Sequence, residues 1–437
     1  MIAKNLQEVI RISNALPLTE KDFEQYYINC TQGRGVEDTI VRLCSLFRTS
    51  NTPQKILFTG HRGCGKTTEL TRLIRELKDS FFIISFSAKE ELDLNNLNFI
   101  DLVITMMTQV YKKAEEERID IQPQLIEDIN EWFSTIVKEY EESKGAGLEI
   151  EAGGGVSALN IFFSKLKGFL KTATTSKTLL RQTIEPKISE LLERSNSLLR
   201  EIKNCLDNRE ILIIVEDLDK LDKSIAKSLF FDHSKQLISL NSHIIYTIPI
   251  SILYSTDSPV LIRDFDNSCE ILPMIKVKDR YGKTDQKGID LLREVVNKRM
   301  AMDMFEEKVL DEIINKSGGC LRDIFLFIKD SALSAISTDK KKIDMDSAKN
   351  TFHRMKGNYE RAITEKIEGN VITTARQYYE KLEEIDSIGI TQPKNDLVLM
   401  DLLHNLCVLE YENGDRWLAL HPIVEDIIRK RRMANNP

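Results

Sequence analysis

The fold is decided by the stretch Gly60-His61-Arg62-Gly63-Cys64-Gly65-Lys66-Thr67, which Thr68 follows. An apolar run at 55–59 precedes it and a helical pattern at 68–77 follows it, which is the context that a phosphate-binding P-loop requires. Its glycines let backbone N–H groups surround a phosphate, Lys66 can reach the β- and γ-phosphate oxygens, and the Thr67 hydroxyl can ligate Mg²⁺. We therefore expect Gly60 to Thr68 to bind a nucleoside triphosphate, as ATP with Mg²⁺.

A second apolar run, 211–215, ends in the acids Glu216, Asp217 and Asp219. A carboxylate at such a strand end orients a Mg²⁺-bound water, and a neighbouring acid polarises the attacking water. Two registers fit this pattern. In the first, which we adopt, Glu216 contacts Mg²⁺ through water and Asp217 is the catalytic base; in the second, these roles pass to Asp217 and Asp219. The alternative is a solvated helix start with aspartate as its N-cap.

Apolar runs that are typical of strands alternate with longer helical patterns, at 55–59, 81–86, 211–215, 244–248 and, weakly, 270–272. This alternation predicts an α/β fold, in which a mainly parallel sheet is flanked by helices on both faces. Ligands of such sheets bind beyond the carboxyl ends of the strands. The P-loop and the acids should therefore meet at one edge of the sheet.

The sequence divides into four expected parts, 1–50, 51–275, 276–360 and 361–437. The first is an N-terminal lead with a helix at 36–47, the second is the P-loop core, and the third is a helical lid. The last part combines a helix at 397–406 with two apolar runs that flank Asn413-Gly414, and a further helix follows. Asn-Gly between apolar runs is a strong hairpin signal, so this part is expected to be a winged-helix-like domain.

A glycine-rich insertion interrupts the core near 143–180. Its apolar side chains between Gly145 and Leu170 exceed what a solvated loop keeps exposed, which predicts a partner-binding or self-association element. Packing of the same side chains on the core is an equal alternative.

Composition restricts the classes of protein. The longest aliphatic run, 211–215, is far too short to span a membrane, and the N-terminus lacks a secretory signal, so we expect a cytoplasmic protein. The 7 scattered cysteines favour neither a zinc site nor a disulfide framework. The net charge of −7 gives no general attraction to nucleic acid, which would need a local basic patch such as Arg429-Lys430-Arg431-Arg432.

The chain resembles the additional-strand branch of P-loop ATPases, and within it AAA+ and STAND-like bacterial ATPases related to the origin-recognition initiator group. The residues that carry the resemblance span nearly the whole chain, at 60–70, 215–221, 245–250, 317–323 and 410–417. Glu216 departs from the aspartate usual at this position in the family, which leaves the Mg²⁺ register open. The glycine-rich insertion has no counterpart in the minimal fold.

The resemblance implies further site residues. Thr247 matches the polar sensor that places the lytic water, and Arg322, after Ser317-Gly318-Gly319, matches a lid arginine that approaches the γ-phosphate. Gly33-Arg34-Gly35 resembles the adenine-side segment. The alternatives are an ordinary strand threonine for Thr247 and a helix-surface arginine for Arg322.

Three functions follow from these patterns. The first is a Mg²⁺-dependent ATPase that couples hydrolysis to assembly or conformational change on a protein partner, as a homo-oligomer in which Arg263 or Arg299 completes a neighbour's site. The second is a nucleotide-dependent switch with negligible turnover. The third is an initiator-like or defence-associated DNA-binding ATPase, against which the net charge of −7 and an acidic hairpin count.

Overall fold

The computed structural model describes residues 2–144, 174–368, 371–388 and 395–435. Its centre is a five-stranded sheet in the order β2-β3-β4-β1-β5. All four pairings within this sheet are parallel. The strands are β1 (Lys55–Thr59), β2 (Phe81–Ser87), β3 (Glu210–Glu216), β4 (His243–Ile248) and β5 (Cys269–Ile271). The predicted α/β fold and its five strands are confirmed.

The position of β4 sets the geometry of the site. It lies between β1, which leads into the P-loop, and β3, which ends in the acids. The carboxyl ends of β1, β3 and β4 therefore meet at one edge of the sheet, as parallel pairing requires.

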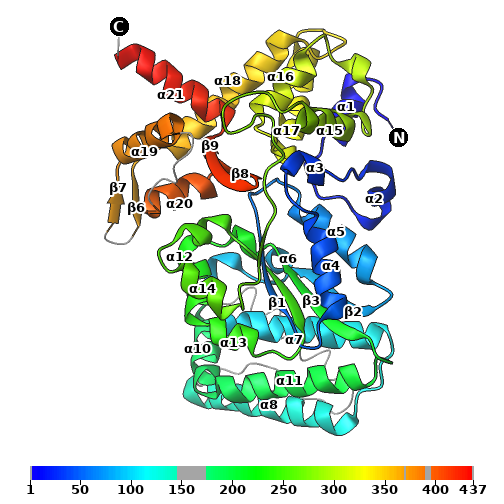
Figure 1. Ribbon diagram of the computed structural model, residues 1–437. Helices are drawn as coiled ribbons and strands as arrows, with labels where there is room; N and C mark the ends of the chain where they lie inside the picture. Colours follow the sequence, from blue (N-terminus) through cyan, green and yellow to red (C-terminus); the bar gives the residue numbers. More distant parts are fainter. Residues whose placement is uncertain (1, 145–173, 369–370, 389–394, 436–437) are drawn as a thin grey trace.

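Helices cover both faces of the sheet because its central strands are apolar on both sides. On one face, Ile56 and Phe58 of β1 pack in a cluster with α4 (Thr39–Thr49) and α5 (Lys66–Leu77). On the other face, Leu57 belongs to the larger core cluster, to which the helices drawn in the lower part of Figure 1 contribute. These helices are α7 (Phe99–Glu116), α8 (Pro123–Lys144), α10 (Thr174–Ile184) and α11 (Ile188–Asn204). The predicted insertion at Gly145 to Leu170 falls outside the described residues.

Short helices surround the rest of the core. They are α6 (Ala88–Glu91), α12 (Lys223–Lys227), α13 (Ser234–Ile238) and α14 (Ser258–Asp264). The N-terminal helices are α1 (Leu6–Ile12), α2 (Glu20–Tyr26) and α3 (Thr31–Arg34). Helix α1 packs on the lid helix α17, and Ala3 forms a parallel bridge with Met300, so the N-terminal lead contacts the lid.

The lid is helical, as predicted, and consists of α15 (Gln286–Asn297), α16 (Val309–Lys316), α17 (Leu321–Ser337) and α18 (Met345–Ala362). The described residues of the C-terminal region form two hairpins and three helices. Its elements are β6 (Lys366–Glu368), β7 (Val371–Thr373), α19 (Ala375–Ile388), α20 (Leu397–His404), β8 (Val408–Asn413), β9 (Asp415–Leu420) and α21 (Pro422–Asn435). The predicted Asn413-Gly414 hairpin is confirmed, with Asn413 opposite Asp415.

The β8–β9 hairpin lies at the centre of the molecule rather than at its periphery. Figure 1 shows it between the sheet and the lid helices. Leu409, Tyr411 and Trp417 of the hairpin belong to the same buried cluster as Cys64 of the P-loop and Cys320 of the lid. The core, the lid and the C-terminal region therefore pack together around the P-loop.

Candidate nucleotide-binding site

The P-loop connects β1 to α5 and has the backbone conformation that its glycines permit. Gly63 and Gly65 have φ angles of +85° and +107°, which side-chain-bearing residues rarely adopt. A Cβ atom on Gly63 would lie 2.6 Å from Cβ of Arg322 and 2.8 Å from Sγ of Cys320. Glycine is therefore required here for close packing of the lid as well as for the turn.

Lys66 faces the acidic turn at 216–219, and we call this side of the P-loop its inner side. Its buried Nζ donates to the carbonyl oxygens of Gly60 and His61 at 2.8 and 3.0 Å, and it forms an ion pair with Oδ2 of Asp219 at 2.8 Å. Burial by itself would lower the pKa of Lys66, but the Asp219 carboxylate outweighs burial and the pKa is raised. Burial likewise opposes ionisation of Asp219, yet Lys66 holds the pKa of that carboxyl below its usual value. The two side chains form a charged pair.

Glu216 lies next to Thr67, on the same side of the loop. Its Oε1 accepts a hydrogen bond from the Ser85 hydroxyl at 3.2 Å, and the nearby Thr67 hydroxyl also favours the ionised carboxylate. Burial outweighs both hydroxyls and raises the pKa of Glu216 to about 7. The Oε2 atom is buried and has no hydrogen-bond partner among the described residues. An unpaired carboxylate oxygen beside a threonine hydroxyl fits a divalent cation, which prefers oxygen ligands.

Asp217 adopts a left-handed conformation with φ of 68°, which turns its side chain away from the P-loop lysine. Its carboxylate accepts a hydrogen bond from Ser87 Oγ at 2.7 Å and pairs with Lys220 Nζ at 2.5 Å. Of the three acids, Glu216 and Asp219 thus contact P-loop side chains, whereas Asp217 contacts the end of β2 and its own turn.

Thr247 is buried at the end of β4 and is held by the backbone of the acidic turn. Its hydroxyl donates to the carbonyl of Val215 at 3.0 Å and accepts from the N–H of Leu218 at 3.1 Å. These two bonds flank Glu216 and Asp217. Thr247 therefore fixes the shape of the turn that presents the acids.

The three arginines proposed from the sequence, Arg322, Arg299 and Arg263, lie in different environments. Arg322 is half-buried, and its backbone N–H donates to the Gly63 carbonyl at 3.3 Å. Arg299 stacks on the rings of Tyr26 and Phe325, with its guanidinium carbon 5.2 and 4.8 Å from the ring centroids. Burial lowers the pKa of Arg299 to about 10. Arg263 on α14 is exposed.

The outer side of the P-loop contacts the C-terminal region. His61 is buried, and its Nε2 accepts a hydrogen bond from the backbone N–H of Glu410 on β8 at 2.7 Å. Burial, together with Lys66, lowers the pKa of His61 to about 3, so the ring is neutral. Arg62 Nη2 lies 3.2 Å from Nε2 of His404, the last residue of α20.

Further contacts hold the same junction together. Tyr411 on β8 donates from its hydroxyl to the carbonyl of Gly318 in the lid at 2.7 Å. Arg34, predicted only as part of an adenine-side segment, is buried and donates from Nη2 to the Cys64 carbonyl at 2.7 Å. The loop is thus braced by the N-terminal lead, the lid and the C-terminal hairpin.

Sequence reasoning missed Ser85, Ser87 and His404. The two serines were detectable as alternating polar residues at the end of a predicted strand. Their contact with the acids depends on the parallel pairing of β2 with β3, which places Ser87 opposite Glu216. No local signal marks His404, because its contact with Arg62 joins residues 342 positions apart.

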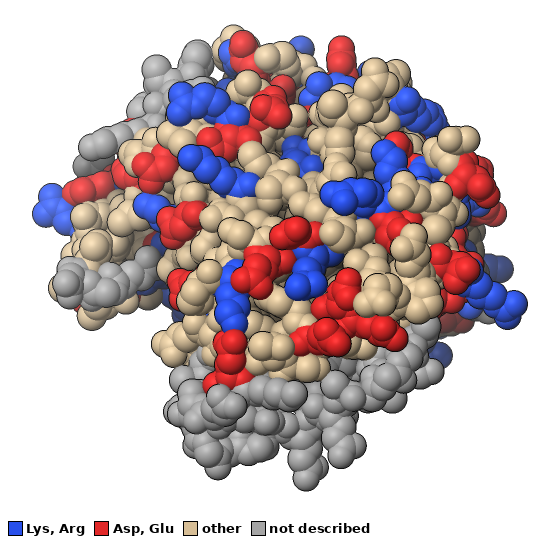
Figure 2. Space-filling model, turned by 90° about the horizontal axis from the view of Figure 1, so that it is seen from below, with Lys and Arg blue, Asp and Glu red and all other residues tan. Residues whose placement is uncertain are grey.

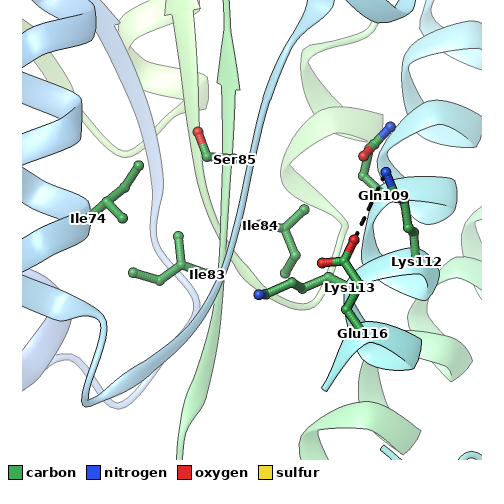
Figure 3. Close-up of a pocket in the computed structure, with 8 residues that line it drawn as sticks. All are labelled: Ile74, Ile83, Ile84, Ser85, Gln109, Lys112, Lys113 and Glu116. Atoms are coloured by element: carbon green, nitrogen blue, oxygen red, sulfur yellow. Dashed lines mark ion pairs between the residues drawn. The ribbon is translucent and has the colours of Figure 1, made fainter. Parts of the chain in front are cut away.

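A separate pocket of about 360 Å³ lies along the edge strand β2, between α5 and α7 (Figure 3). Its lining residues are Ile74, Ile83, Ile84, Ser85, Gln109, Lys112, Lys113 and Glu116, and they include no residue of the P-loop. Lys112 and Glu116 within it form an ion pair at 4.0 Å. The pocket adjoins the site only through Ser85, whose hydroxyl donates to Glu216.

Two properties of the described residues bear on ligands and location. Among them, no group of three or more His, Cys, Asp and Glu side chains could hold a metal ion. A Mg²⁺ ion at Glu216 and Thr67 would therefore take its other ligands from phosphate and water, which is the usual way that Mg²⁺ binds. No helix in the described part of the chain is long and apolar enough to cross a membrane.

Comparison with known proteins agrees with this geometry. The model of the KAP family P-loop domain matches residues 40–241, a little less than half of the chain. The match begins in α4, ends before β4, and includes both the P-loop and the acidic turn. No curated protein matches the sequence.

Several solved structures resemble the chain over nearly its whole length. Three of them are Cdc6p from Pyrobaculum aerophilum, the Aeropyrum pernix ORC1 protein in complex with DNA, and Drosophila ORC bound to DNA. In that order, identities are 12%, 12% and 13%, and TM-scores are 0.39, 0.39 and 0.38. The alignments cover 99%, 98% and 99% of this chain, and 99%, 97% and 94% of the other chains. Similarity at this level does not indicate what this chain binds.

The family match includes the same residues that the geometry brings together. The matched segment contains Lys66 and Asp219, whose side chains meet, and Thr67 and Glu216, which also meet. Both observations identify a P-loop NTPase domain in this chain.

Proposed function

We propose that this protein binds Mg·ATP at the P-loop and hydrolyses it to ADP and phosphate. The observation that carries the proposal is the inner side of the loop, where Lys66 meets Asp219 and Thr67 meets Glu216. Phosphoryl transfer to water needs a cation that binds the phosphates, an oxygen ligand for the metal ion and a second acid. Lys66, Glu216 and Asp219 are the candidates for these three parts. All of them lie at one end of the sheet.

Each residue has a role in this proposal. Lys66 leaves Asp219 to bind the β- and γ-phosphates, and the P-loop N–H groups hold the phosphate chain. Thr67 and Glu216 would hold Mg²⁺, whose charge offsets that of the phosphates. Arg322 approaches the terminal phosphate from the lid. Thr247 acts on the acids through the turn that its hydroxyl holds.

The acid that accepts the proton of the attacking water is assigned by proximity. Asp219 forms an ion pair with the phosphate-binding Lys66. Asp217 instead accepts a hydrogen bond from Ser87 and pairs with Lys220. We therefore favour Asp219 as the base, with Glu216 as the Mg²⁺ ligand. This arrangement takes one acid from each of the two registers that the sequence left open.

The test is ATP turnover by the full chain with Mg²⁺. We expect phosphate release that requires Mg²⁺ and that is lost in Lys66→Ala and strongly reduced in Asp219→Asn. ATP binding without turnover would support the nucleotide-dependent switch instead. Absence of ATP binding would overturn the proposal.

Coupling to the lid and the C-terminal region is the second part of the proposal. His61, Arg62 and Gly63 contact β8, α20 and α17, so a loop that moves with the nucleotide also moves these contacts. A partner that binds the lid or the C-terminal region would then sense the nucleotide. Self-assembly stays a prediction, for which the exposed Arg263 suits a neighbour's site better than the stacked Arg299 does.

The C-terminal basic run and the face shown in Figure 2 offer little support for DNA binding. In the C-terminal basic run, Arg429 pairs with Glu425, Arg431 with Glu383, and Arg432 with Asp386. On the face shown in Figure 2, Lys and Arg alternate with Asp and Glu, and no broad basic area appears among the described residues there. Phosphate backbones are bound by cations that are free to displace counterions.

A further inference from the structure

Arg62 is the feature of the P-loop that the proposed chemistry leaves unexplained. Its side chain is half-buried, and Nη2 donates to the carbonyl of Lys220 at 3.3 Å and lies 3.2 Å from Nε2 of His404. Both partners are neutral. One is a backbone carbonyl, and the other is His404, whose pKa is lowered to about 4 by burial and by Arg62 itself. No carboxylate of the described residues forms an ion pair with Arg62. A partly buried guanidinium with only neutral partners is an unusual arrangement, since buried charges are normally paired.

The location of Arg62 connects it to the phosphate-binding end of the sheet. Burial lowers the pKa of Arg62, and Arg322 lowers it further, whereas the carboxylates of Asp219 and Asp222 raise it. The same Asp219 forms the ion pair with Lys66, and Arg322 also acts on Lys66. Arg62 and Lys66 therefore both lie within electrostatic reach of the buried Asp219, at the end of the sheet where phosphates would bind. Among the described residues, Arg62 forms no ion pair there, so its guanidinium can turn to a polyanion.

We propose that Arg62 is a catalytic residue that contacts the γ-phosphate from within the same subunit and leaves His404 to do so. This inference rests on the proposed ATP hydrolysis. Water forms the new bond to the γ-phosphorus, its proton passes to Asp219, and the bond to the β,γ-bridging oxygen breaks with its electron pair on ADP. Arg62 stays protonated throughout and stabilises the charge that develops on the phosphoryl oxygens.

The other two arginines considered for this task are placed less well for it. Arg299 is held between Tyr26 and Phe325. Arg263 is exposed on α14 and requires a second copy of the chain to reach a phosphate. Arg62 belongs to the loop that surrounds the phosphates, so no assembly step is needed.

The experiment compares the wild type with Arg62→Ala and Arg62→Lys in the full chain, and Arg263→Ala tests the alternative that a neighbouring subunit supplies the arginine. We expect Arg62→Ala to lower kcat by roughly 100-fold, as removal of a single transition-state donor does. ATP affinity should fall about tenfold and ADP affinity should change less than twofold, because only ATP carries the phosphate that Arg62 contacts. Arg62→Lys should recover part of kcat, since it keeps the charge without the guanidinium fork.

Two results for Arg62→Ala would overturn the inference. One is equal weakening of ATP and ADP binding in Arg62→Ala, which indicates a structural role for the side chain. The other is a kcat for Arg62→Ala within threefold of the wild type. Loss of turnover in Arg263→Ala, with turnover per chain rising steeply with protein concentration, would assign the cation to a neighbouring subunit.

His404→Ala tests the exchange of partners. Removal of His404 should strengthen ATP binding several-fold and leave ADP binding unchanged, because Arg62 then gives up no contact with His404 when it turns to the phosphate. Weaker ATP binding would contradict the exchange. A wild type that binds ATP without hydrolysing it would overturn the proposed hydrolysis alone, and the ATP-to-ADP preference would still decide whether Arg62 contacts the phosphate. A wild type that binds neither nucleotide would overturn both.

Discussion

The two sides of the P-loop differ in the kind of contact they make. On the inner side, Lys66 and Thr67 meet Asp219 and Glu216, so the contacts are between a cation or a hydroxyl and an acid. On the outer side, His61 accepts from a backbone N–H of β8, Arg62 approaches a neutral histidine, and Gly63 accepts from the backbone of α17.

This difference assigns two roles to one short loop: the inner side binds phosphate and metal, and the outer side connects the loop to the lid and the C-terminal region. Charged contacts on the inner side can be exchanged for phosphates and a metal ion, which carry matching charges. Neutral contacts on the outer side instead fix where the lid and the C-terminal region sit. A change on the inner side should therefore affect catalysis first, and a change at the other outer-side contacts should affect stability first. Arg62 is the exception, because we propose that it leaves its outer-side contact for the γ-phosphate.

The largest expected effect is on the inner side. Asp219→Asn keeps the size of the side chain and removes its capacity to accept a proton, so turnover should fall by roughly 100- to 1,000-fold. Steady-state phosphate release measures this fall. Asp217→Asn is the matched control, and we expect it to stay within tenfold of the wild type. The opposite ranking would restore Asp217 as the base.

Lys66→Ala should weaken ATP binding by roughly 100-fold, because it removes charge-assisted hydrogen bonds to two phosphates. Calorimetric titration with ATP gives the affinity. The variant also leaves Asp219 buried without its partner, so its thermal stability must be measured in parallel. Wild-type affinity in a folded Lys66→Ala protein would contradict the inner-side assignment.

Glu216 makes the inner side sensitive to pH. Its pKa is raised from 4.5 to about 7, so the folded protein holds this proton more tightly than the unfolded chain does. The stability that this group contributes therefore falls as the pH rises from 4.5 to 7, by an amount on the order of 2 kcal/mol. The difference in unfolding free energy between wild type and Glu216→Gln should change by that amount over this interval.

Metal binding should follow the same ionisation. Because Mg²⁺ binds the ionised carboxylate, its affinity should rise with pH up to about 7 in the wild type and stay flat in Glu216→Gln. Comparison with the variant cancels the contribution of the buried histidines. Identical pH profiles of Mg²⁺ affinity in the two proteins would remove Glu216 from the metal site.

The smallest effect is expected on the outer side. Tyr411→Phe removes only the hydroxyl that donates to Gly318, and the unfolding free energy should fall by about 1 kcal/mol. Denaturant titration measures this loss. ATP affinity should stay within twofold of the wild type, since the Tyr411 hydroxyl bonds to the lid and not to the inner side. A tenfold change in ATP affinity would show that the two sides are coupled more tightly than their contacts suggest.

The inner side could be predicted from sequence because its parts are local signals. A glycine-rich loop follows an apolar run, and acids follow another, so parallel pairing alone brings them together. The choice between Asp217 and Asp219 could not be predicted, because it depends on a left-handed residue within the acidic turn. The outer side was also out of reach, since His61 meets Glu410 across 349 positions and neither residue is distinctive.

The central claim is that the inner side binds and hydrolyses Mg·ATP. Its most direct test is phosphate release by the full chain, measured for the wild type and Lys66→Ala with Mg²⁺ and again with the metal chelated. We predict release by the wild type only when Mg²⁺ is present, and none above background from Lys66→Ala. Equal release by both proteins, or release that persists without Mg²⁺, would contradict the claim.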